Sequence, residues 1–415
     1  MGQIRNLATG PSAQTLATSI AGQALTLISG VIAARALGVE GRGLFAYLWL
    51  IPVTLVLLGG IGVPQATTFY VAREEGNAAG VVRISVRISL VLAALLTTAY
   101  AVGLFLIGGD DPRITTVEAI LSVLLVPVFL ASNLGIAALL GMKRYGTFNI
   151  ARVAPPFFYA LGATILFLLG HVSLLTILSA SVLSFGTSAI VIWILVRRDL
   201  PSSGGETAAT PREIIGFGLR GVVGSVSPVD DVRIDQLLVG ALMNARALGL
   251  YVAAVAFCNL PRFIAYAIGS VSFPRIASAG SRAEAWALAR KALRIFLALA
   301  TVTVVSLFLL LPYLLPLLFG NDFKEAVGLG QILLIAAFFL ALHRLLTELA
   351  RGLGHPGYGS ITEIVNVAVF ALAVLILATP ATTNGIAESV VAGGIASSSL
   401  LLFLLFRLRL KQRDL

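Results

Sequence analysis

Ionisable residues gather at one point near the middle of a chain that is otherwise strongly apolar. Asp230, Asp231, Arg233 and Asp235 fall within six residues, between apolar runs that are long enough to cross a membrane. A single charge near the centre of a bilayer costs about 2.5–3.5 kcal/mol on insertion scales. Four charges are tolerable there only if they face one another, water or a charged ligand. The sequence therefore predicts either a ligand site or an internal network of ion pairs.

Arginines inside the apolar runs supply the chemistry for binding an anion. A guanidinium group is planar and permanently charged, and it pairs with phosphate through two parallel hydrogen bonds. Arg262 is the strongest candidate for a phosphate contact, and the alternative is an ion pair with Asp231 or Asp235. For Arg220, the alternative to a substrate contact is that its side chain extends to the lipid headgroups. The predicted substrate-binding residues are Arg220, Arg233, Arg262 and Arg344.

Carboxylates in the same runs are candidates for coupling to a proton or Na⁺, or for pairing with the arginines. Asp231 and Asp235 are four residues apart and would share one face of a regular helix. Glu348 follows Arg344 by four residues, so these two could pair within one helix or face a cavity together. The predicted residues for ion coupling or charge pairing are Asp231, Asp235 and Glu348. No cluster of histidines and cysteines suggests a metal, and no motif indicates a cofactor.

Composition places these charges in an all-α integral membrane protein. Of 415 residues, 58% are hydrophobic and 12% are charged, against about 25% charged in soluble domains. The basic residues are scattered in short loops, so the formal charge of +10 does not indicate nucleic-acid binding. Apolar runs of about 20 residues recur from end to end. We expect twelve transmembrane helices, at about 13–36, 44–70, 84–107, 117–141, 150–169, 173–196, 214–242, 249–274, 291–318, 329–352, 358–378 and 386–406.

The distribution of lysine and arginine predicts the orientation of these helices. If the N-terminus is inside, twenty basic residues near span ends fall on the inner side and five on the outer side. The positive-inside rule then places both termini in the cytoplasm. The span from 214 to 242 contains Gly221, Gly224 and Pro228, which permit a kink or a break.

The twelve spans divide into two sets of six. A polar stretch rich in Ser, Gly and Thr, 201–213, is predicted to be a cytoplasmic linker between an N-terminal six-helix lobe (1–200) and a C-terminal lobe (214–415). Because six is an even number, both lobes would enter the membrane from the same side, as a parallel repeat with a pseudo-two-fold axis. Short motifs recur in the two halves: Ala34-Arg-Ala-Leu-Gly38 as Ala245-Arg-Ala-Leu-Gly249, and Leu140-Gly141 with Tyr145-Gly146 as Leu353-Gly354 with Tyr358-Gly359. Gly43-Leu-Phe-Ala46 also resembles Gly249-Leu-Tyr-Val252.

Three segments, in order along the whole chain, resemble bacterial polysaccharide flippases of the Wzx type. These form the polysaccharide transporter branch of the multidrug/oligosaccharidyl-lipid/polysaccharide exporter superfamily. The segments are similar to the first hairpin, the seventh span and the end of the ninth span of that family: Arg35-Ala-Leu-Gly-Val-Glu-Gly-Arg-Gly-Leu-Phe45, Arg233-Ile-Asp-Gln-Leu-Leu-Val-Gly240 with Ala247-Leu-Gly-Leu-Tyr-Val-Ala-Ala254, and Leu315-Pro-Leu-Leu-Phe-Gly-Asn-Asp-Phe323.

The resemblance implies two six-helix lobes that flip undecaprenyl-pyrophosphate-linked oligosaccharide from the inner to the outer leaflet of the cytoplasmic (inner) membrane. Its partners would be that lipid-linked oligosaccharide, membrane lipids, a coupling proton or Na⁺, and the glycosyltransferases and polymerase of surface polysaccharide synthesis, with no nucleic acid. A multidrug/cation antiporter of the same superfamily is one alternative, which a net acidic cavity would favour. A membrane-embedded glycosyltransferase or polymerase is another. The short loops and the lack of a nucleotide-binding or nucleophile motif favour a transporter over an enzyme.

Overall fold

The computed structural model describes residues 11–73, 77–107, 113–200, 209–378 and 381–411. These residues form helices and short connections, and no strand occurs among them. The chain divides into two compact units, Met1–Val226 and Ser227–Leu415, which we call the first unit and the second unit. Most of the predicted linker, 201–208, lies outside the described residues.

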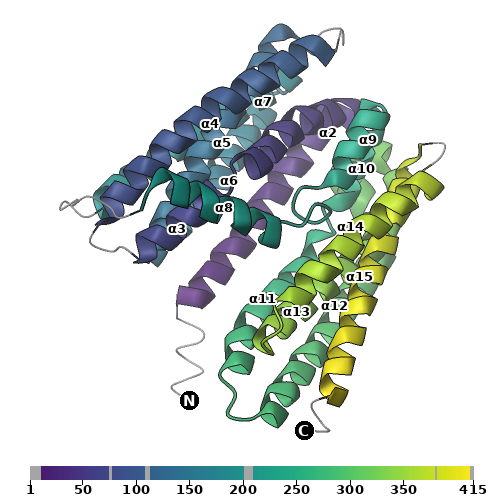
Figure 1. The fold of residues 1–415 in the computed structure, drawn as a ribbon. Coiled ribbons are helices and arrows are strands. Elements are labelled where there is room, and N and C mark those ends of the chain that lie inside the picture. Colours follow the sequence, from purple (N-terminus) through teal and green to yellow (C-terminus); the bar gives the residue numbers. More distant parts are fainter. Residues whose placement is uncertain (1–10, 74–76, 108–112, 201–208, 379–380, 412–415) are drawn as a thin grey trace. The chain divides into compact units, whose positions relative to one another are not determined.

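The first unit is built around one central helix. That helix, α5, packs against α2, α3, α4 and α7, while α6 packs against α2 and α7, and α8 against α3. The helices run as follows (Figure 1): α2 Pro11–Gly59, α3 Val63–Arg73, α4 Ala78–Ile107, α5 Thr116–Gly141, α6 Tyr145–Leu168, α7 Leu174–Asp199 and α8 Pro211–Ser225.

The second unit repeats this arrangement with α13 at its centre. The central helix packs against α10, α11, α12, α14 and α15, so the segment that carries Arg344 and Glu348 is surrounded by other helices. The elements run as follows (Figure 1): α9 Ile234–Leu242, α10 Ala245–Val255, α11 Asn259–Ala277, α12 Arg282–Phe319, η2 Asn321–Phe323, α13 Ala326–Gly352, α14 Gly357–Leu377 and α15 Thr383–Lys411.

The matching pattern of contacts defines the internal repeat. α5 and α13 each pack against three corresponding helices: the second one before them in the chain (α3 and α11), the one directly before them (α4 and α12), and the second one after them (α7 and α15). The end of α5 at Gly141 therefore corresponds to the end of α13 at Gly352. The motifs Leu140-Gly141 and Leu353-Gly354 lie at these equivalent turns but are two residues out of register. The first recurring motif does not occupy equivalent positions in the two units, because Ala34–Gly38 ends a helical segment whereas Ala245–Gly249 begins α10.

Nine helices in the described part of the chain are long and apolar enough to cross a membrane, or ten if α10 and α11 form one bent span. The prediction of an all-helical, multi-pass protein is confirmed, although this count is below twelve. One reason is that α2 is interrupted at Gly38, whose φ of 68° breaks the helix, so α2 contains the first expected span and the larger part of the second. The other is that the expected span 214–242 is divided between α8 and α9, each of which is short.

The short helix α8 belongs to the first unit, although the sequence predicted that the second lobe begins at residue 214. Thr210 caps its start, accepting a hydrogen bond from the backbone N–H of Glu213 while Glu213 accepts from the Thr210 backbone. These hydrogen bonds, the backbone one foremost, lower the pKa of Glu213 below its ordinary value. Phe217 stacks on Phe69 of α3 with the ring centroids 4.4 Å apart. The structural boundary between the units therefore lies at Val226, after α8.

A crossing of two glycines fixes α8 on the first unit. A Cβ atom on Gly218 would collide with the backbone of Ile61 and Gly62, where the chain turns between α2 and α3. Gly62 has a φ of 69°, which glycine adopts without strain. Gly216 lies on the same helix, but a Cβ atom there would meet only the end of the Arg220 side chain, at 4.0 Å.

We predict that Gly218→Ala destabilises the protein by about 1–3 kcal/mol, because the methyl group must push two backbone segments apart. Gly216→Ala is the matched control, since it adds the same methyl group to the same helix without a collision. Thermal unfolding of the purified variants in detergent would measure both effects. Equal melting temperatures for the two variants would contradict the close crossing.

Candidate functional site

The second unit begins with an eight-residue break in the helix, between α8 and α9, and this break carries the charged stretch of the sequence. The side chains of the loop hydrogen-bond its own backbone: Ser227 N–H donates to Asp231 Oδ2 (3.0 Å), and Asp230 N–H donates to Ser227 Oγ (3.1 Å). Such local bonds compete with helix formation. Pro228 lacks an N–H, and Arg233 takes the left-handed conformation (φ 59°) just before α9. The polar residues thus open the helix as well as line the site.

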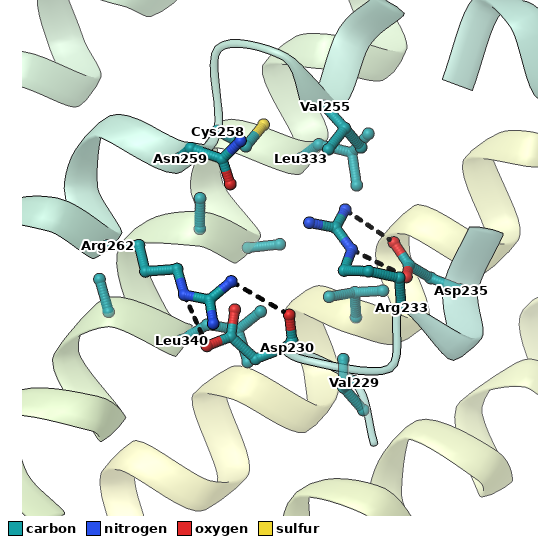
Figure 2. A pocket seen from close by; sticks show the side chains of 14 residues that line it. Val229, Asp230, Arg233, Asp235, Val255, Cys258, Asn259, Arg262, Leu333 and Leu340 are labelled. Atoms are coloured by element: carbon teal, nitrogen blue, oxygen red, sulfur yellow. Dashed lines mark hydrogen bonds and ion pairs between the residues drawn. The ribbon is translucent and has the colours of Figure 1, made fainter. Parts of the chain in front are cut away.

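Two arginines from different helices converge on the two aspartates of this loop. Arg262 of α11 places Nε 3.3 Å from Asp230 Oδ2, and its Nη2 pairs closely with Asp231 Oδ1. Arg344 of α13 places Nη1 3.1 Å from the same Asp230 oxygen and 3.7 Å from Asp231 Oδ1. Figure 2 shows Arg262 and Asp230 turned toward one another. Each guanidinium therefore contacts both carboxylates, and Asp230 Oδ2 serves two arginines at once.

A second ion pair lies at the other side of the same pocket (Figure 2). Arg233 Nη2 is 3.4 Å from Asp235 Oδ2, and the side chain of Asp235 is only 3% exposed. Tyr251 of α10 is fully buried and donates its hydroxyl to Asp235 Oδ2 at 2.9 Å. Asp235 is thus held by two partners, and it fixes the direction in which Arg233 points.

A third polar group extends from the loop to α14. Ser227 Oγ donates to Glu363 Oε1 at 2.6 Å, and Asn366 Nδ2 donates to the same oxygen at 3.3 Å. His343 Nδ1 is 3.6 Å from Glu363 Oε2, while its Nε2 is 2.8 Å from the hydroxyl of Thr362. Among the described residues, the buried Oδ1 of Asn366 has no hydrogen-bond partner. The Oδ1 atom of Asn366 can therefore accept a hydrogen bond or bind a cation.

The pocket between these groups is small. Its water-accessible volume is about 30 Å³, which is room for about two water molecules. Its polar wall comes from the loop, the start of α9 and the start of α11, namely Asp230, Arg233, Asp235, Asn259 and Arg262, and α13 supplies an apolar wall. A ligand as large as a pyrophosphate can enter only if the ion pairs open.

The charges of the site nearly cancel. Three arginines (Arg233, Arg262 and Arg344) face three aspartates (Asp230, Asp231 and Asp235), and each arginine has a carboxylate partner. Glu363 adds a further carboxyl group beside the loop. An anionic ligand must therefore compete with these carboxylates for the guanidinium groups.

The structure brings together five of the seven residues that the sequence singled out: Arg233, Arg262, Arg344, Asp231 and Asp235. The prediction that Asp231 and Asp235 share one face of a helix was wrong, because Asp231 lies in the loop and Asp235 lies in α9. Glu348 pairs with Arg351 at 2.9 Å and not with Arg344. Arg220 lies on α8 in the first unit, where its Nε donates to the carbonyl of Gly216.

Three further residues complete the site: Asp230, Tyr251 and Glu363. Asp230 stands next to Asp231 in the sequence, but spacing alone does not reveal that it bridges two other helices. Glu363 and Tyr251 are single polar residues in apolar runs, and intramembrane carboxyl groups are a recognised signal of function. The sequence suggests that Glu363 could line this lobe, but the partners of both residues come from distant parts of the chain, so only the fold identifies these contacts.

Comparisons with known proteins agree with this architecture. The model of the family described as "Polysaccharide biosynthesis protein" matches residues 12–279. An inward-facing multidrug resistance MATE family transporter of the MOP superfamily is similar, with a TM-score of 0.74 and 18% identity over 98% of this chain and 97% of that one. The outward-facing structure of such a transporter gives 0.68 and 16% over 97% and 96%. MATE in complex with MaL6 gives 0.67 and 16% over 97% and 96%.

No curated protein matches the chain. The solved structures share less than a fifth of their residues with it, so they show its fold alone. The family model, in contrast, covers well over half of the sequence. The chain therefore belongs to the family described as "Polysaccharide biosynthesis protein".

Proposed function

We propose that this protein is a transporter that flips undecaprenyl-pyrophosphate-linked oligosaccharide from the inner to the outer leaflet of the cytoplasmic membrane by alternating access. The product would serve surface polysaccharide synthesis, together with glycosyltransferases and a polymerase. The observation that carries the proposal is the convergence of Arg262 and Arg344 on shared carboxylates, in an apolar helical chain of the polysaccharide biosynthesis family. Two guanidinium groups at one point match the charge of a pyrophosphate.

The shared aspartates suggest how the site binds and releases its substrate. Asp230 and Asp231 occupy Arg262 and Arg344 when no anion is present, which avoids leaving charges unpaired in the membrane. A pyrophosphate would replace the carboxylates as the partner of both arginines. Asp230 and Asp231 would then be freed, and the loop that carries them joins α8 of the first unit to α9 of the second. Substrate binding would in this way act on the segment that connects the units.

The freed carboxyl groups offer a means of coupling to an ion gradient. Without arginine partners, Asp231 would take up a proton or bind Na⁺ more readily, because an unpaired carboxylate inside the membrane is costly. Glu363 and Asn366 lie on α14, where Glu363 accepts a hydrogen bond from Ser227 of the loop. Glu363 and the unpartnered oxygen of Asn366 would form a second place for a cation. Glu348, which pairs with Arg351 elsewhere on α13, is not needed for this coupling.

A cation antiporter of the same superfamily is the second candidate. The three arginines of the site are balanced by three aspartates, and Glu363 adds a further carboxyl group, so the number of arginines does not by itself exclude a cationic substrate. The two candidates differ in which charge enters the site. An anion would displace the aspartates from the arginines, whereas an organic cation would pair with Glu363 or an aspartate.

We predict that Arg262→Gln and Arg344→Gln each weaken binding of undecaprenyl pyrophosphate to the purified protein by about 10-fold or more, because a charge-assisted pair is lost. Arg262→Lys should be intermediate, since it keeps the charge without the paired geometry. Titration in lipid nanodiscs would measure the affinities. The matched control is Arg246→Gln, which removes an arginine from an exposed pair with Glu325. Unchanged affinity in both glutamine variants would exclude these arginines as the pyrophosphate site.

We also predict that flipping in proteoliposomes accelerates with an imposed proton or Na⁺ gradient, and that Asp231→Asn or Glu363→Gln removes most of that acceleration. A fluorescent lipid-linked pyrophosphate that becomes accessible in the outer leaflet would report the rate. Glu348→Gln should keep the gradient dependence, because its partner is Arg351. Equal rates with and without gradients in the unmodified protein would rule out ion coupling. Gradient-driven uptake of an organic cation in place of the lipid would favour the antiporter.

A further inference from the structure

The first unit contains a larger cavity, and none of the described residues that line it is charged. Its volume is about 340 Å³, and it lies where α2 gives way to α3, against α5. Its polar side chains are two carboxamides and one hydroxyl, Gln65, Asn133 and Thr68, and the remaining lining is apolar or glycine. A few polar groups in an apolar cavity of a few hundred cubic ångströms are typical of a small-molecule site.

The two carboxamides are exposed and have no hydrogen-bond partner among the described residues, whereas Thr68 donates to the carbonyl of Ala137 at 3.0 Å. Gln65 lies eight residues before Arg73, and Asn133 lies ten residues before Lys143. At a rise of about 1.5 Å per residue these are about 12 and 15 Å from the basic ends of their helices. Both groups therefore lie within a hydrocarbon core of about 30 Å. Unsatisfied amides are costly in lipid, so the cavity must hold water or a polar ligand.

The internal repeat relates this cavity to the face of α13 that carries Arg344, Glu348 and Arg351. Gly141 ends α5 and packs against Val71 and the Thr68 carbonyl of α3, while Gly352 ends α13 and packs in the same manner against Ile276 and the Phe273 carbonyl of α11. These two glycines are equivalent, so the two central helices can be aligned on them.

The alignment pairs an amide with an arginine. Asn133 is eight residues before Gly141, and Arg344 is eight residues before Gly352. By the same count Ala137 and Leu140 of the cavity correspond to Glu348 and Arg351 of α13. The face of α13 that carries three charges in the second unit is thus neutral in the first unit.

We infer that the cavity of the first unit is a binding site for an uncharged sugar residue of the transported molecule, with Gln65 and Asn133 as its hydrogen-bonding groups; this rests on the proposed function. A carboxamide both donates and accepts, so it matches the hydroxyl groups of a hexose. No described residue that lines the cavity is a cation, so a sugar carboxylate would be buried there without a partner. The two units would divide recognition between them: sugar in the first, pyrophosphate in the second.

The test compares undecaprenyl pyrophosphate without sugar, with one neutral hexose and with the corresponding hexuronate, each bound to the full chain in nanodiscs. The hexose should tighten binding and the hexuronate should not. In the double variant Gln65→Leu/Asn133→Leu the gain from the hexose should fall by about 10-fold or more, as expected for two lost hydrogen bonds. Affinity for the sugar-free lipid should stay unchanged. Gln14→Leu is the matched control, because Gln14 is also exposed but lies at the start of α2, away from the cavity.

Three outcomes would overturn the inference: an equal hexose gain in the double variant, an equal gain from the hexuronate, or no gain in the unmodified protein. The proposed function fails in a different way, when the sugar-free lipid does not bind or when Arg262→Gln leaves its affinity unchanged. In that case a soluble methyl hexoside still tests the cavity. Saturation-transfer NMR should detect its binding to the unmodified protein and lose it in the double variant and in Asn133→Ala; an unchanged signal in those variants would refute the site.

Discussion

The ion pairs between the loop at 227–233 and the helices α11 and α13 are the interaction on which the second unit depends. Arg262 and Arg344 contact Asp230 and Asp231 across the break between α8 and α9. Each charge alone would be costly within a membrane, and removing one partner would leave the others uncompensated. The same pairing that makes the charges tolerable also anchors an otherwise unwound segment. Stability and the proposed binding of pyrophosphate therefore draw on one set of side chains.

The duplicated architecture explains why one chain can present two different chemical environments. Both units place their fourth span at the centre and pack the same set of neighbours around it. Gly141 and Gly352 allow the ends of these helices to approach a neighbouring backbone closely. On this common scaffold, α13 carries charges where α5 carries Asn133 and apolar side chains. Small changes on one helix face thus decide whether a cavity suits an anion or an uncharged polar group.

Glycine and proline control where helices of this protein stop being regular. Gly38 interrupts α2, and the close approach of Gly62 to Gly218 holds α8 on the first unit. Pro228 lies in the loop whose polar side chains bind their own backbone. Gly62 lines the cavity of the first unit, and the loop at 227–233 lines the pocket of the second. The irregular segments are therefore the ones that can hold a ligand.

The sequence by itself determined the class of the protein, the approximate positions of its spans and the cluster of charges near Asp231. These follow from local properties: the length of apolar runs, the cost of charge in lipid, and loop composition. Only the tertiary structure decided that Asp230 bridges two arginines, that Tyr251 supports Asp235, and that α8 belongs to the first unit. Such partners lie many residues apart and come from several helices. Their meeting depends on how helices pack, which spacing along one helix cannot reveal.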